Sequence, residues 1–110
     1  MDIEITRGDT ARFKFARQGE GGIIYDRADK LYFSVKSTYS SNTLVLQKTI
    51  DDMTFNEGYY SFVIEPSDTD NLEYKEYVYD IEVITDTYKQ TIAKGKFIID
   101  YEVTFVGDEN

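Results

Sequence analysis

The chain contains no cysteine, no histidine and no tryptophan, and it has a single proline among 110 residues. Without cysteine no disulfide can form, so a reducing compartment is the default expectation. Without histidine the chain lacks the commonest general base and the commonest metal ligand. Most hydrolase and metalloenzyme schemes are hard to assemble from what is left. We therefore expect a protein that is not an enzyme and that holds no cofactor and no metal.

Long apolar runs are also missing. No stretch approaches the roughly 20 residues of a membrane-spanning helix, and the first residues do not resemble a signal peptide, so we expect a soluble protein made in the cytoplasm. The net charge of −9 is uneven: residues 1–50 carry 8 basic and 6 acidic groups, and residues 51–110 carry 4 basic and 15 acidic groups. An acidic half repels a phosphate backbone, so no nucleic-acid partner is expected. We interpret the acidic net charge as a contribution to solubility.

Alternation of apolar and polar residues is the dominant pattern, and no helical pattern reaches ten residues. About seven alternating segments, spaced 8–15 residues apart, predict an all-β, immunoglobulin-like antiparallel sandwich, with a small barrel as the alternative. We expect one domain over residues 1–106, a disordered tail at 107–110, a mobile glycine-rich loop at 18–22 and one helical turn near 67–72. The clearest alternating segments are 31–35, 59–65, 77–83 and 97–103.

Local signals refine this fold prediction. Ser67 follows the proline and precedes Asp70 by three residues, which is typical of a capped helical turn. Leu72 precedes Tyr77 by five residues, a spacing that fits a tyrosine corner, in which the phenol bonds upstream backbone where the chain crosses between sheets. A plain core tyrosine at a strand start is the alternative. Gly95 interrupts a strand and predicts a bulge or a close approach of backbone.

Three short motifs could carry function, but each has a stronger structural interpretation. The tripeptide at 7–9 spells Arg-Gly-Asp, yet Gly-Asp is ordinary turn chemistry. The run 68–71 resembles the start of a calcium loop, but the central glycine is missing and Tyr79 stands at the twelfth position, which requires a glutamate. Asp80 and Glu82 could serve glycoside hydrolysis as a carboxylate pair, but their equal parity places both on one exposed strand face. None of these motifs predicts a catalytic or metal site.

Several sequence pieces occur in a characteristic order along the chain. The pieces are Arg7–Thr10, Leu31–Lys36, Ile64–Thr69, Tyr77–Ile81, Gly95–Phe97 and Val103–Thr104. Each piece is short, and the specificity lies in their order over residues 5–104. In this order the chain resembles the β-sandwich domain of bacteriophage and prophage tail proteins, in particular the N-terminal domain of baseplate upper proteins from phages of Gram-positive hosts.

The resemblance implies a virion structural protein that docks to neighbouring tail or baseplate proteins, either in the virion or in the bacterial cytoplasm when a prophage expresses it. Outward tyrosines are the candidate contacts, namely Tyr32, Tyr59 and Tyr88. A homo-oligomer is possible, and a small-molecule ligand is not expected. One alternative is a carbohydrate-binding or host-recognition module, in which these tyrosines stack on sugars. A weak hydrolase using paired carboxylates is the third hypothesis.

Overall fold

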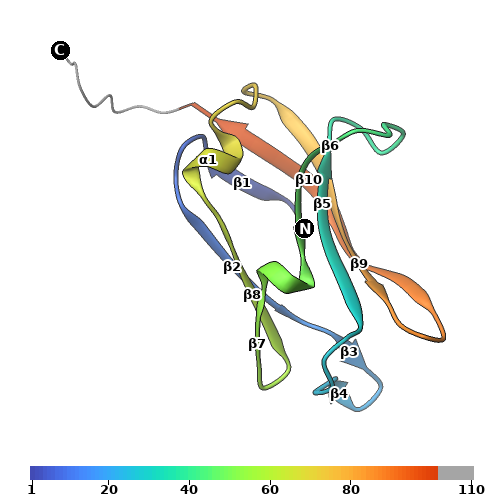
Figure 1. Ribbon diagram of the computed structural model, residues 1–110. Helices are drawn as coiled ribbons and strands as arrows, with labels where there is room; N and C mark the ends of the chain where they lie inside the picture. The colour runs from blue at the N-terminus through green and yellow to red at the C-terminus, as the bar shows by residue number, and fades with distance from the viewer. Residues whose placement is uncertain (102–110) are drawn as a thin grey trace.

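The computed structural model describes residues 1–101, and in these residues almost all regular structure is β-strand (Figure 1). A five-stranded sheet has the order β1-β10-β9-β5-β6, and a three-stranded sheet has the order β2-β8-β7. Strands β3 and β4 form a separate two-stranded ribbon. The strands are β1 (Ile3–Thr6), β2 (Ala11–Ala16), β3 (Gln18–Gly19), β4 (Gly22–Ile23), β5 (Lys30–Lys36), β6 (Leu44–Thr49), β7 (Thr54–Asn56), β8 (Tyr59–Ile64), β9 (Glu76–Ile84) and β10 (Lys89–Asp100), and the short helices are η1 (Ile50–Asp52) and α1 (Pro66–Thr69).

The all-β prediction is confirmed, with two corrections. The five-stranded sheet is mixed, because β1 runs parallel to β10 with Ile3 opposite Phe97, so the fold is not strictly immunoglobulin-like or antiparallel. The loop predicted at 18–22 instead contains strand β3, a turn and the start of strand β4, which pairs with β3. Alternation shows which face of a strand is buried but not the direction of its partner, which explains the first error. The predicted domain end at 106 and the tail at 107–110 lie outside the described residues.

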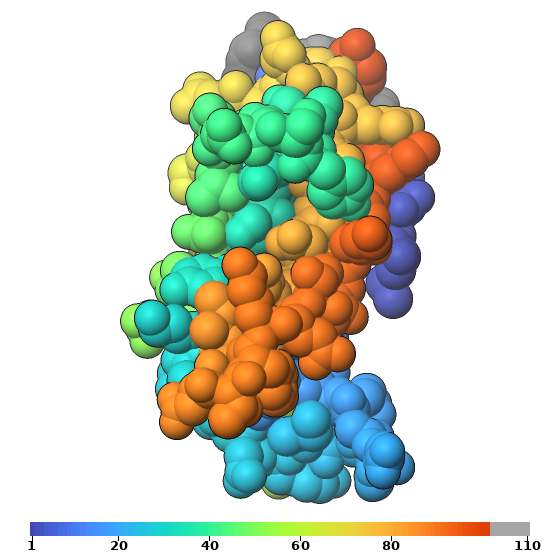
Figure 2. All heavy atoms as spheres, turned by 90° about the vertical axis from the view of Figure 1, so that its right-hand side faces the viewer, coloured from blue at the N-terminus to red at the C-terminus, as the bar shows by residue number. Residues whose placement is uncertain are grey.

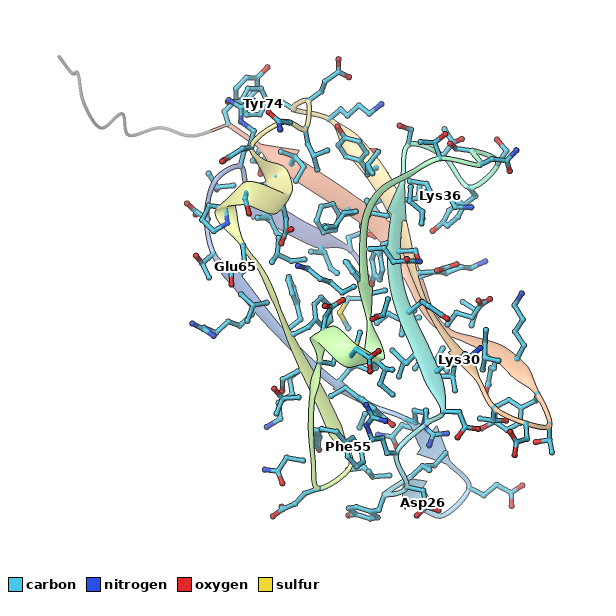
Figure 3. The ribbon with its side chains drawn as sticks, viewed as in Figure 1. Asp26, Lys30, Lys36, Phe55, Glu65 and Tyr74 are labelled. Carbon is cyan, nitrogen blue, oxygen red and sulfur yellow. The ribbon has the colours of Figure 1, made fainter. Side chains whose placement is uncertain are left out.

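The core lies between the inner faces of the two sheets, where side chains from both sheets fill the space (Figure 3). Phe33 of β5 is fully buried and meets Phe62 of β8 across the sandwich, with ring centroids 4.8 Å apart. Tyr60 and Phe97 are also fully buried. Burying a large apolar side chain stabilises a fold by about 1.5–3 kcal/mol. The apolar positions of the alternating pattern are therefore the ones that hold the two sheets together.

The hairpin between β7 and β8 shows why one glycine is required. Glu57 and Gly58 both have positive φ, 51° and 87°, which is the backbone of the tight turns that suit the twist of a hairpin. A Cβ at Gly58 would also meet the side chain of Ile23. A side chain at Gly58 would therefore be both strained and crowded, so glycine suits the second turn position.

Helix α1 begins earlier than the sequence suggested. Its N-cap is Glu65, and the carboxylate of Asp68 accepts a hydrogen bond from the Glu65 N–H at 2.7 Å. The predicted pair, Ser67 and Asp70, does not form the cap. Pro66 explains the difference, because proline fits the first helical position and the cap must precede it.

The chain then crosses from the three-stranded to the five-stranded sheet through a tyrosine corner. The Tyr77 hydroxyl donates to the Glu73 carbonyl at 3.1 Å and accepts from the Glu73 N–H at 2.9 Å. Leu72 packs against the core beside it. These are the contacts that the tyrosine-corner interpretation predicts, and they distinguish Tyr77 from a plain core tyrosine.

Candidate interaction surface

The most distinctive surface feature is an apolar groove along one open side of the sandwich. Strand β2 pairs only with β8, so its other edge has no strand partner within residues 1–101. A hollow of about 330 Å³ lies between this edge and the N-terminal residues. Its lining comprises residues 1–4, Phe13, Lys14, Phe15, Phe33, Phe62, Tyr79, Ile81 and Ala93.

The groove is apolar because aromatic rings on the β2 edge are only partly covered by the rest of the chain. Tyr60 and Phe62 of the central strand β8 are almost fully buried, whereas Phe13 and Phe15 of β2 are only half-buried on the same inner face. Phe13 stacks on Phe62 with centroids 5.5 Å apart, and Phe15 stacks on Tyr60 at 5.3 Å. Each β2 ring thus has one covered and one open flank, and the open flanks form a wall of the groove.

The opposite border is held in place by the first residue of the chain. The Tyr79 hydroxyl donates to the carbonyl of Met1 at 2.6 Å. Gly95 makes room for this contact, since a Cβ there would collide with the same carbonyl. The prediction of a close backbone approach at Gly95 is therefore confirmed. The irregularity in β10 lies elsewhere, between Thr91 and Ala93.

Charges of opposite sign line the two borders of the groove. Arg12 and Lys14 are exposed on the outer face of β2, and the Lys14 ammonium lies 4.8 Å from the ring centroid of Tyr59. Glu4 stands on the N-terminal border, close to Asp100 at the end of β10. A shared hydrogen bond with Asp100, together with its like charge, raises the pKa of Glu4. The β2 edge is therefore basic in a strongly acidic protein.

The tyrosines chosen from the sequence do not form one patch. Tyr32 and Tyr59 are half-buried, and Tyr88 is 45% exposed and lies near the turn between β9 and β10. The β5–β6 loop and the β9–β10 hairpin lie over the outer face of the five-stranded sheet, which is the face in Figure 2. Strand parity predicts which way a side chain points, but only the loops decide how much of it is covered. The most exposed tyrosines are Tyr25 at 66%, Tyr39 at 53% and Tyr101 at 70%.

The Arg-Gly-Asp tripeptide has the structural role that its turn chemistry predicted. The Arg7 guanidinium lies 4.1 Å from the ring centroid of Tyr74, which in turn stacks on Tyr101 at 4.0 Å. The Gly8 N–H donates to the Thr69 hydroxyl at 3.0 Å. Figure 3 places Tyr74 at the α1 end of the sandwich. These contacts hold the β1–β2 turn against α1 rather than presenting a recognition loop.

One polar residue that the sequence did not single out is Arg17. Its side chain is only 6% exposed, and it donates to the Asp26 carbonyl at 2.6 Å and to the Tyr88 hydroxyl at 3.3 Å. Its Nε is buried without a hydrogen-bond partner in the described chain. Arg17 ties the β3–β4 end of the molecule to the β9–β10 turn. Nothing in the sequence separates it from the exposed basic residues of β2.

The described residues contain no cluster of three or more acidic side chains that could hold a metal ion. Asp68, part of the apparent calcium motif, is bonded to backbone and to Lys48 at 2.8 Å. Glu82 of the carboxylate pair lies 3.7 Å from Lys89. Within residues 1–101 no helix is long and apolar enough to cross a membrane.

Comparison with models of known families and with curated proteins finds no match for this chain.

Proposed function

We propose that this protein is a non-enzymatic structural module that acts through protein–protein contacts in the tail or baseplate of a phage or prophage. The observation that carries the assembly role is the edge of β2, which has no strand partner within residues 1–101 and lies beside a groove lined by half-buried aromatic rings. Such an edge offers main-chain donors and acceptors, while the groove offers pockets for alternate side chains. Together they suit a peptide strand better than a small molecule.

The phage assignment rests on the ordered sequence pieces. In the folded chain these pieces serve the framework: residues 31–36 run along β5, residues 64–69 form the end of β8 and α1, and residues 77–81 lie in β9. They therefore support a shared architecture, and the docking role follows from that likeness. The location proposed with it is the virion tail, or the bacterial cytoplasm before assembly.

Two experiments test this function. Tail or baseplate genes beside the coding sequence support it, and a neighbourhood without phage genes counts against it. In a lysogen, a tagged chain should sediment with tail particles after induction and should appear only in the low-mass fraction without induction. If the tagged chain stays in the low-mass fraction after induction, while other tail proteins sediment with particles, the tail role is refuted.

A further inference from the structure

We propose that the groove beside β2 accepts residues 102–106 of a second copy of this chain as an added β-strand. This inference deepens the proposed function by naming a partner. The occupant must have an apolar side for the half-buried rings and a side compatible with the basic outer face of β2. It must also be an extended segment, because the β2 edge presents backbone groups.

The segment 102–106 meets these requirements by sequence. It reads Glu-Val-Thr-Phe-Val, so Val103 and Phe105 share one side of an extended strand, and Glu102 and Thr104 share the other. Beta-branched and aromatic residues of this kind favour strands. Residues 102–110 carry three acidic groups and no basic group. The segment is thus an acidic, strand-forming sequence next to the last described residue.

The two alternations match when the segment lies along β2. The inner side of β2 carries Phe13 and Phe15, and the outer side carries Arg12 and Lys14. With Val103 and Phe105 turned into the groove, Glu102 and Thr104 lie on the same face as the basic residues. Opposite charges on neighbouring strands are favourable, while like charges oppose the pairing of two β2 strands. The β2 side of the groove therefore favours an acidic strand over another copy of itself, while Asp2 and Glu4 stand on the opposite border.

Reach favours a second copy over the same chain. Tyr101 follows the end of β10 and stacks on Tyr74. Facing sheets lie roughly 10 Å apart, and one residue spans at most about 3.6 Å. A segment crossing to the β2 edge of its own molecule would use about three residues, 102–104, in the crossing. A second copy can place all five residues along β2, because none of them is used in a crossing within its own chain.

The contact is heterologous, because residues 102–106 of one copy meet the β2 groove of the next copy. Such contacts build rings when the rotation closes and filaments when it does not. This geometry suits a tail component, and self-association of the purified chain can be measured without any other tail protein.

The first test is self-association of the full chain by sedimentation velocity, from about 1 µM to about 1 mM, which covers weak complexes. The wild type should shift to larger species as concentration rises. Phe105→Asp, which places a charge in the groove, should weaken association by about tenfold or more, because burying an unpaired charge is costly. Val106→Asp is the matched control on the outer side and should change it by less than about threefold. A wild type that stays monomeric throughout, or equal effects of the two variants, would overturn the proposal.

The second test uses the absence of cysteine. Chains carrying Lys14→Cys are mixed with chains carrying Thr104→Cys, since both side chains lie on the outer side of the paired strands. Mild oxidation should give a mixed disulfide dimer, identified by mass, and a mixture with Val103→Cys should give far less, because disulfides require Cα atoms within about 7 Å and converging Cβ atoms. A chain carrying both Lys14→Cys and Thr104→Cys should form linked oligomers. If it forms an internal disulfide in a monomer, the strand docks within one chain and the proposal is wrong, while the tail role is still tested by sedimentation with particles.

Discussion

Tyr77→Phe removes one oxygen from the tyrosine corner and leaves the buried ring in place. The hydroxyl makes two hydrogen bonds to the backbone of Glu73, at 2.9 and 3.1 Å. A protein hydrogen bond contributes roughly 0.5–1.5 kcal/mol net, so the two together amount to about 1–3 kcal/mol of unfolding free energy. For a chain of this size that loss lowers the melting temperature by about 4–12 °C.

Urea denaturation followed by circular dichroism measures this change directly. The midpoint should fall while the slope stays the same, because the mutation alters stability and not the surface exposed on unfolding. Tyr32→Phe is the matched control, since the Tyr32 hydroxyl makes no hydrogen bond to protein among the described residues, and it should change stability by less than about 0.5 kcal/mol. If Tyr77→Phe costs no more than Tyr32→Phe, the corner does not stabilise the crossing between the sheets.

The same hydroxyl also predicts a pH dependence. Burial raises the pKa of Tyr77 in the folded chain, and burial likewise raises the pKa of Tyr79. The unfolded phenols titrate near pH 10, so the unfolded chain loses these protons first. Their contribution is complete below about pH 10 and is lost as the pH rises through the folded-state pKa values. Melting curves from pH 8 to pH 11 should show a shallower alkaline decline in Tyr77→Phe than in the wild type, and parallel declines would contradict this assignment.

Two further substitutions test the helix cap and the N-terminal contact. Asp68→Ala removes the hydrogen bond from the Glu65 N–H at the start of α1 and the ion pair with Lys48, so it should lower the unfolding free energy by about 1–2 kcal/mol in urea titrations. Asp70→Ala should change it by less than about 0.5 kcal/mol, and equal costs of the two variants would favour the Ser67–Asp70 cap predicted from the sequence. Gly95→Ala places a Cβ against the Met1 carbonyl and should lower the unfolding free energy by about 1–3 kcal/mol, measured by thermal melting. The control, Gly21→Ala, has open space around the added Cβ and should leave the unfolding free energy almost unchanged. If Gly95→Ala is also neutral, the N-terminal contact adds no stability.

The sequence predicted those features that depend on neighbouring residues along the chain. Alternation at 31–35 and 59–64 marked the core faces of β5 and β8, because strand side chains point to opposite faces with a period of two. The five-residue step from Leu72 to Tyr77 predicted the tyrosine corner, because its hydrogen bonds join residues only four positions apart. Gly95 predicted a close approach, although the sequence did not say which residue comes near.

Other features depended on segments that are distant in the chain. The parallel pairing of β1 with β10 joins residues more than 90 positions apart, and the burial of Arg17 depends on the β9–β10 turn. The exposure of Tyr32, Tyr59 and Tyr88 depends on the loops and side chains that cover them. The groove beside β2 likewise exists because β2 lies at a sheet edge. The sequence by itself thus determined a cysteine-free, acidic, all-β chain with its core faces and corner, since these follow from composition and local spacing. Only the tertiary structure decided that β2 lies at a sheet edge beside a groove, because an edge is defined by the strands that are not beside it.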